Sequence, residues 1–191
     1  MLITKVKPVD EILPLVSGRV IALCCEGCSE VHYPEKDVVA VLNKIMVSGT
    51  DNAIFELVYM CSQEHLDLYL QNNADLLNEF DTILVASCGV GVQALCGKVR
   101  NVSSATVISV CDTLKVPGFQ GLTPFKFDCA LCGECHLNET AAICPITSCA
   151  KSLLGGGCGG AKNGMCETDS AVECGWERIY KRLALYNPPT P

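Results

Sequence analysis

Four short apolar runs recur in the first part of the chain, at residues 19–25, 54–60, 82–87 and 105–110. Runs of this length, without polar alternation, are typical of strands that are buried on both faces of a sheet. The segments between them show helical periodicity, most clearly over residues 35–47. This alternation of strand and helix predicts an α/β fold with a small parallel, Rossmann-like sheet.

Start and stop signals place the other helices. Ser62 is a suitable N-cap for a helix after the second apolar run, and Asn72-Asn73 is expected to break that helix. A short helix is expected over residues 92–99. Pro8 and Asp10 predict one or two helical turns before Pro14 interrupts them.

The segment from Pro117 to Pro124 ends this pattern, because its glycines and prolines favour turns. We therefore expect two domains, an α/β domain over residues 1–118 and a loop-rich cysteine domain over residues 119–191 that ends in a helix over 176–186. The second domain has too few apolar residues for a core of its own, so bound inorganic centres are expected to hold it together.

The amino-acid composition limits the possible roles of the cysteines. The chain has 15 cysteines and three histidines among 191 residues, and an odd number of cysteines cannot all pair within one chain. The N-terminus lacks the pattern of a signal peptide, and no apolar run approaches a membrane span. We expect a reducing cytoplasmic location, where dense cysteine indicates metal or redox chemistry. The net charge of −7 argues against nucleic-acid binding.

Cysteines follow or end each predicted strand, at Cys24/Cys25, Cys61, Cys88 and Cys111. Ligands of open α/β sheets bind beyond the carboxyl ends of the strands, so these thiols are expected to converge on one edge. Gly89 and Gly91 would allow close backbone approach to whatever Cys88 binds. Cysteine is also a small apolar core residue, and this alternative interpretation is the better one for Cys24, Cys96 and Cys111 taken singly.

The run Cys129-x2-Cys132-x2-Cys135 has the spacing of a bacterial ferredoxin cluster loop, and Cys144-Pro145 is similar to its proline-flanked fourth cysteine. Eight residues separate Cys135 from Cys144, where a ferredoxin has about three. Three thiolates on so short a loop favour an iron–sulfur cluster over zinc. Four widely spaced cysteines remain in this region and are expected to bind zinc or a further cluster: Cys149, Cys158, Cys166 and Cys174.

No catalytic residue is identified in this chain. The three histidines, His32, His65 and His136, are scattered, and no Ser/His/Asp set or carboxylate pair is visible. No flavin-binding or folate-binding motif is visible either. The sequence therefore predicts an electron-transfer or binding component that is inactive alone.

The tail from Leu153 through Cys158-Gly-Gly and Cys166 to Cys174-Gly-Trp176 closely resembles the methylenetetrahydrofolate reductase C-terminal family. Over residues 10–186 the chain also resembles the small cysteine-rich subunits of acetogen-type reductases in that family, including Ser87-Cys88-Gly-Val-Gly91. The resemblance implies three four-thiolate sites. They are a [4Fe–4S] cluster on Cys25, Cys28, Cys61 and Cys88, a second on Cys129, Cys132, Cys135 and Cys144, and zinc on Cys149, Cys158, Cys166 and Cys174.

The resemblance further implies a partner, a (β/α)8-barrel (TIM-barrel) reductase subunit that carries FMN, in a higher-order hetero-oligomer. The chain would relay electrons through two [4Fe–4S] clusters to that flavin, which reduces methylenetetrahydrofolate to methyltetrahydrofolate in anaerobic one-carbon metabolism (the Wood–Ljungdahl pathway). Two alternatives remain open. One is a non-redox adaptor stabilised by zinc. The other is an iron–sulfur subunit of a heterodisulfide-reductase-like or hydrogenase-linked complex.

Overall fold

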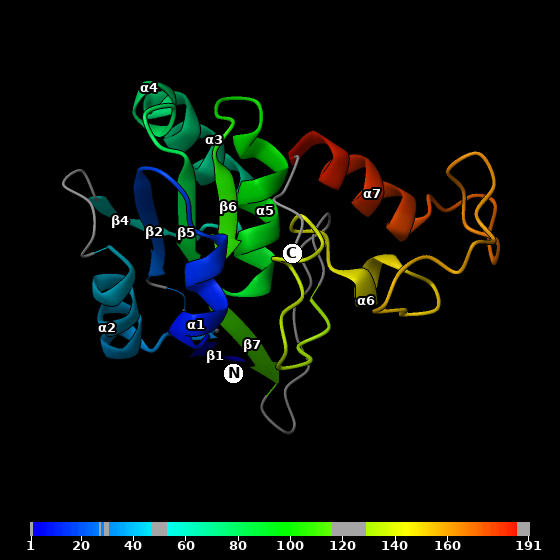
Figure 1. Ribbon diagram of the computed structural model, residues 1–191, viewed down its shortest axis with the longest axis horizontal. Coiled ribbons are helices and arrows are strands. Elements are labelled where there is room, and N and C mark those ends of the chain that lie inside the picture. Colours follow the sequence, from blue (N-terminus) through cyan, green and yellow to red (C-terminus); the bar gives the residue numbers. More distant parts are fainter. Residues whose placement is uncertain (1, 27, 29–30, 47–52, 116–128, 187–191) are drawn as a thin grey trace.

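The computed structural model describes residues 2–26, 28, 31–46, 53–115 and 129–186 (Figure 1). Its main sheet is parallel and consists of β2 (Val20–Glu26), β4 (Ala53–Val58), β5 (Thr82–Ala86) and β6 (Thr106–Ser109). The strand order is β4-β2-β5-β6. The four apolar runs are these strands, and the predicted α/β class is confirmed.

Helices cover both faces of the sheet. One core cluster joins β2 and β5 to α1 (Val9–Ile12) and α2 (Glu35–Met46). The other lies under α3 (Gln63–Asn72), α4 (Ala74–Leu77) and α5 (Gly89–Val99). The expected break after Asn72 separates α3 from α4, whereas α5 begins at Gly89, three residues earlier than predicted. A 3₁₀ turn, η1 (Leu13–Leu15), contains Pro14.

The strand order creates a switch point between β2 and β5. From β2 the chain runs outward to β4, and it then returns across β2 to add β5 and β6 on the other side. Adjacent connections therefore leave the neighbouring strands β2 and β5 in opposite directions. Such a point leaves a crevice at the carboxyl ends of the two strands, where ligands of doubly wound sheets bind.

A second, small sheet was not predicted from the sequence. It contains β3 (Val31–His32), β1 (Leu2–Val6) and β7 (Cys111–Lys115), with β1 antiparallel to β7. Cys111, expected at the end of the fourth strand, instead begins β7. The ribbon of β1 and β7 depends on pairing between residues more than 100 positions apart, which leaves no local signal in the sequence.

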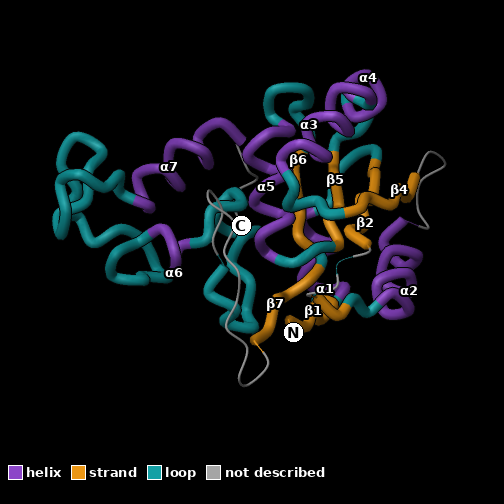
Figure 2. The backbone as a smooth tube through the Cα atoms, turned by 180° about the vertical axis from the view of Figure 1, so that it is seen from behind, coloured by secondary structure: helices purple, strands orange, loops and turns teal. Residues whose placement is uncertain are grey.

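The cysteine-rich segment consists mostly of turns, with α6 (Pro145–Ser148) and α7 (Gly175–Tyr186) as its only helices in the described residues. Leu137 and Ala142 are buried in the core beneath α5, so the start of this segment packs against the α/β layers. The part that holds α6, α7 and the loops between them extends to one side in both backbone views (Figures 1 and 2). The expected boundary at 117–124 lies outside the described residues, and the division into two domains stays a prediction.

Candidate metal centres

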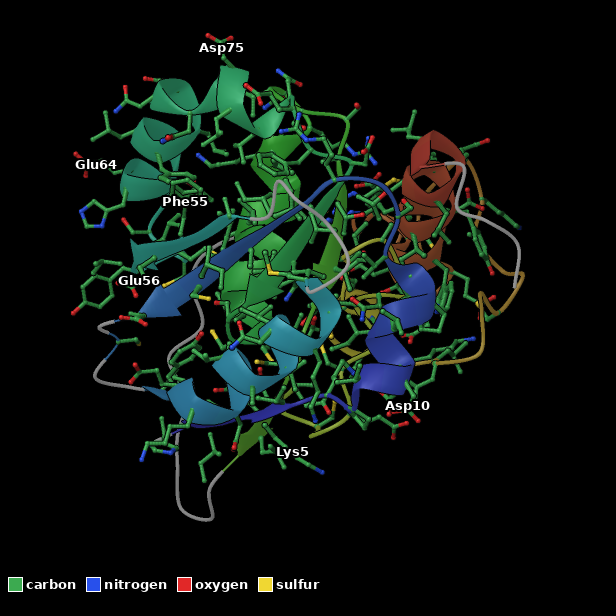
Figure 3. The ribbon with its side chains drawn as sticks, turned by 60° about the vertical axis from the view of Figure 1, so that its left-hand side comes forward. Lys5, Asp10, Phe55, Glu56, Glu64 and Asp75 are labelled. Carbon is green, nitrogen blue, oxygen red and sulfur yellow. The ribbon has the colours of Figure 1, made fainter. Side chains whose placement is uncertain are left out.

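The first cavity lies at the switch point of the main sheet. Its wall includes the four cysteines expected to form one site: Cys25, Cys28, Cys61 and Cys88. Cys25 is the second-last residue of strand β2, Cys61 follows β4 after Tyr59 with its positive φ, and Cys88 precedes α5. In Figure 3, sulfur atoms (yellow) lie near the end of β2. The parallel topology thus brings together thiols that are up to 63 positions apart.

Of the two adjacent cysteines at the end of β2, only Cys25 lines this cavity. Side chains alternate across a strand, so Cys24 points to the opposite face and is buried in the core beneath α1 and α2. Cys111, the cysteine after the fourth predicted strand, is 0% exposed in that same core. The cavity therefore includes Cys61 and not Cys111.

Burial controls the acidity of these thiols. Desolvation raises the pKa of Cys25 to about 11, although the Met60 amide donates a hydrogen bond to its Sγ at 3.4 Å. Burial also raises the pKa of Cys88, while the backbone N–H groups of Gly91 and Val90 oppose the rise. Those amides belong to the first turn of α5, where unpaired N–H groups favour a thiolate. Without a metal, the thiols of Cys25 and Cys88 are protonated at neutral pH.

The second cavity is lined by the other predicted cluster set: Cys129, Cys132, Cys135 and Cys144. Strand β7 holds the loop that carries the first three. The Gly133 amide donates to the Thr113 carbonyl at 3.0 Å, and the Cys135 amide donates to Asp112 Oδ1 at 2.9 Å. Leu131 and Gly133 have positive φ, which lets the loop curl tightly enough to turn its thiols inward. Burial raises the pKa of Cys129 to about 12 and that of Cys135 to about 11.

Residues at the start of α5 line both cavities. Cys88 lines the first cavity and Gly89 lines the second. The Gly89 amide donates to Thr113 Oγ1 at 2.8 Å, and a Cβ atom at this position would lie 3.2 Å from Cys129 Sγ. A side chain here would therefore crowd the second site. The glycine lets the two four-cysteine cavities approach each other closely.

The tail cysteines are gathered less completely. Cys158 and Cys174 line one cavity, and Cys149 packs in the same small apolar cluster as Cys174. Backbone hydrogen bonds join Cys166 to this region: its amide donates to the Val172 carbonyl at 2.8 Å, and the Cys174 amide donates to the Gly164 carbonyl at 2.8 Å. The Thr168 hydroxyl, 3.1 Å from Cys166 Sγ, lowers the pKa of this partly exposed thiol.

The donor chemistry of the first two cavities fits a [4Fe–4S] cluster, because four thiolates per cluster are its usual protein ligands. The first cavity also has a buried hydroxyl, Ser87 Oγ, without a hydrogen-bond partner. Among the residues that the structure describes, no group of three or more Cys, His, Asp or Glu side chains is arranged to hold a single metal ion.

Several residues around the second cavity had no role predicted from the sequence. Gln93 on α5 accepts a hydrogen bond from the Cys144 amide at 3.3 Å and donates to the Gly89 carbonyl at 3.1 Å. His136 lines the cavity, and Lys7 pairs with Asp112 behind Cys135. These residues come from distant parts of the chain, so only the fold reveals their relation to the cysteines.

We expect metal binding at the two cavities to strengthen as the pH rises. Their thiols have raised pKa values, about 11 for Cys25 and about 12 for Cys129, so a metal must displace protons at neutral pH. Each coordinated thiol adds up to about a tenfold gain in apparent affinity per pH unit below its pKa. Titration of metal-free protein with Cd²⁺ between pH 6 and 9, followed by thiolate charge-transfer absorbance, measures this slope.

Cys111→Ala is the matched control, because the pKa of Cys111 is also raised, to about 12, but its side chain lies outside both cavities. This variant should keep the slope of the wild-type protein. Cadmium affinity that did not change with pH would contradict coordination by these buried thiols.

Trp176 provides a reporter for the tail region, because it is the single tryptophan of the chain. It is 7% exposed beside Cys174, and its Nε1 donates to the Leu153 carbonyl at 3.0 Å. If zinc ties the tail loops together, its removal by a chelator should expose the indole and shift its fluorescence to longer wavelength. Zn²⁺ added back should restore the emission, and Cys158→Ala should show the shifted emission before chelation. Unchanged emission after complete zinc removal would contradict this prediction.

Comparison with known proteins gives one finding. Residues 108–188 match the family described as methylene-tetrahydrofolate reductase C terminal. No curated protein and no solved structure matches the chain. Within the described residues, no helix has the length and apolar character needed to cross a membrane. The matched range includes β7, the loop of the second cavity and the tail cysteines, which agrees with the resemblance seen in the sequence. The C-terminal part of the chain, residues 108–188, is therefore similar to the methylene-tetrahydrofolate reductase C-terminal family.

Proposed function

We propose that this chain is the electron-transfer subunit of a methylenetetrahydrofolate reductase complex. The observation that carries the proposal is the pair of four-cysteine cavities on either side of the first turn of α5. Two one-electron centres at such close range would form a relay. A single structural site would not require two adjacent thiol-lined cavities that share a helix terminus.

Each cavity would hold one [4Fe–4S] cluster, which supplies one-electron transfer when bound. The ligands in the first would be Cys25, Cys28, Cys61 and Cys88, and in the second Cys129, Cys132, Cys135 and Cys144. Zinc on Cys149, Cys158, Cys166 and Cys174 would join the tail loops to α7. The protein residues around each cavity would position the thiolates, exclude water and adjust the charge near the sulfur atoms.

The reduction of methylenetetrahydrofolate would take place in a partner. The family assignment gives the chain an oxidoreductase context in one-carbon metabolism and supports a partnership with a reductase subunit. That partner would be a TIM-barrel flavoprotein that carries FMN and binds the folate, and the chain alone would have no reductase activity. The role of this chain would be to deliver electrons one at a time to the flavin.

The test is anaerobic purification of the full chain, alone and co-expressed with a candidate flavoprotein from the same organism. Two clusters predict a brown protein with about eight iron atoms per chain, bleached by dithionite. Reduced clusters should reduce the flavin of the partner when the two proteins are mixed. A colourless protein with zinc and no iron would overturn the proposal and favour the zinc-stabilised adaptor. Folate reduction by the isolated chain would also overturn it.

A further inference from the structure

Ser87 occupies an unusual position in the wall of the first cavity. It follows β5 directly, precedes the ligand candidate Cys88, and is 2% exposed. Its Oγ is buried and has no hydrogen-bond partner. An unpaired hydroxyl in a protein interior costs free energy, so such groups have a partner in the functional state or are replaced by apolar side chains.

The hydroxyl of Ser87 lies beside the thiols of Cys25 and Cys88. Ser87 is close enough to Cys25 and to Cys88 to oppose the rise that burial causes in the pKa of each thiol. It is not aligned for a hydrogen bond of standard geometry with either sulfur. The hydroxyl therefore lies beside two sulfur atoms and borders the space between them.

The backbone keeps room for this hydroxyl. Gly91 lines the same cavity, and a Cβ atom there would lie 2.1 Å from Ser87 Oγ. Any other residue at position 91 would displace the serine side chain. Glycine costs helix stability in the first turns of α5, and here it leaves space for a polar group that has no partner within the described protein.

We propose that Ser87 donates a hydrogen bond to the iron–sulfur centre held by Cys25, Cys28, Cys61 and Cys88, and that it raises the reduction potential of this centre above that of the same site without the hydroxyl. The inference rests on the proposed function. Reduction adds one negative charge to a cluster, and a donor beside its sulfur atoms stabilises that charge. Ser87 would be a positioning and tuning residue, and the four cysteines would remain the only ligands.

The test compares full-length wild type with Ser87→Ala, both reconstituted anaerobically with iron and sulfide. Iron content and the EPR-monitored midpoint potentials of both centres are measured. We expect Ser87→Ala to keep its iron while one of the two potentials becomes more negative, by about 59 mV if the equilibrium constant for reduction falls tenfold. The potential of the other centre should not change. Ser87→Thr, which retains a hydroxyl, should recover most of the shift.

Ser103→Ala is the matched control. Ser103 is also a buried serine, 5% exposed, but its Oγ donates to the Leu77 carbonyl at 3.0 Å and lies outside both cavities. It should lower the thermal midpoint of the metal-free protein without changing either potential. Ser87→Ala should leave that thermal midpoint unchanged or higher, because the hydroxyl it removes has no partner there.

Two results would overturn the inference while leaving the proposed function intact. One is a fully loaded Ser87→Ala protein with both potentials unchanged. The other is loss of iron from Ser87→Ala but not from Ser103→Ala, which would make the hydroxyl necessary for holding the centre and not for tuning it. A wild-type chain that takes up no iron would instead overturn the proposed function and this inference with it.

Discussion

Cys88→Ala should remove one of the two proposed iron–sulfur centres and about half of the iron, because each [4Fe–4S] cluster needs four protein ligands. Cys88 lies at the N-terminus of α5, and the amides of Val90 and Gly91 favour its thiolate form. Alanine supplies no ligand, and no other cysteine lines the first cavity beyond Cys25, Cys28 and Cys61 among the described residues. Iron and sulfide analysis of anaerobically purified protein measures the loss.

The matched control is Cys96→Ala, on the same helix two turns later. Cys96 is 1% exposed in the core beneath α5, contacts the Ala141 carbonyl and lines neither cavity. Its removal takes away a small apolar contact and no candidate ligand, so the iron content should stay at the wild-type level. Equal iron loss in both variants would show that Cys88 and Cys96 affect iron content by stabilising the fold and not by binding iron. Full iron in Cys88→Ala would contradict the first ligand set.

The centre that remains in Cys88→Ala should be the one in the second cavity. Its EPR signal should persist in the reduced protein, and Cys135→Ala should remove that signal instead. Cys88, which lines the first cavity, directly precedes Gly89, which lines the second, so a small change in the second signal is expected when the first site is lost. Complete loss of both signals from either single variant would indicate that the two sites do not load independently.

The sequence predicts the main sheet and the first cavity because parallel strands obey strong rules. Apolar runs reveal the buried strands β2, β4, β5 and β6, and the carboxyl ends of parallel strands share one edge. A cysteine that follows such a strand must lie near that edge. The choice between Cys24 and Cys25 needs one more fact, the face to which each side chain points, and this depends on the register of β2 with its neighbours.

Only part of the second cavity can be predicted from the sequence. The spacing of Cys129, Cys132 and Cys135 is a local feature, and it predicts a cluster-type loop without a structure. The elements that hold this loop are not local. Strands β1 and β7 pair across the length of the α/β region, and the polar residues that they contribute have no motif of their own. The tail set is the least defined, because its cysteines lie on turns whose arrangement follows neither a helix nor a strand period.

Lys7→Met should destabilise the fold by about 3–5 kcal/mol, because it leaves a buried carboxylate without its cation. Lys7 Nζ lies 2.8 Å from Asp112 Oδ1, and the two side chains are only 7% and 13% exposed. Burial alone would lower the pKa of Lys7, but the hydrogen bond and the charge of Asp112 outweigh it and hold that pKa above its usual value. The ammonium group is therefore charged throughout the neutral range.

Lys7→Met should also affect the second cavity, because Asp112 contacts both Lys7 and the cysteine loop. The same Oδ1 atom that binds Lys7 accepts the Cys135 amide at 2.9 Å, so the ion pair helps to hold the cysteine loop. Lys7→Met should thus reduce loading of the second site as well as stability. Asp112→Asn combined with Lys7→Met removes both charges, and the double variant should be less destabilised than the sum of the single variants.

Urea unfolding of the metal-free protein, followed by circular dichroism, measures these free energies. Lys5→Met is the matched control: Lys5 lies on β1 with an exposed side chain (Figure 3), and its loss should change stability by no more than about 0.5 kcal/mol. The pKa of Lys7 is higher in the folded protein than in the unfolded chain. The stabilisation of the fold by Lys7 should therefore be complete below pH 10.5 and should decline as the pH rises through the folded-state pKa. If Lys7→Met is no less stable than Lys5→Met at pH 7, the buried pair does not hold β1 against the cysteine loop.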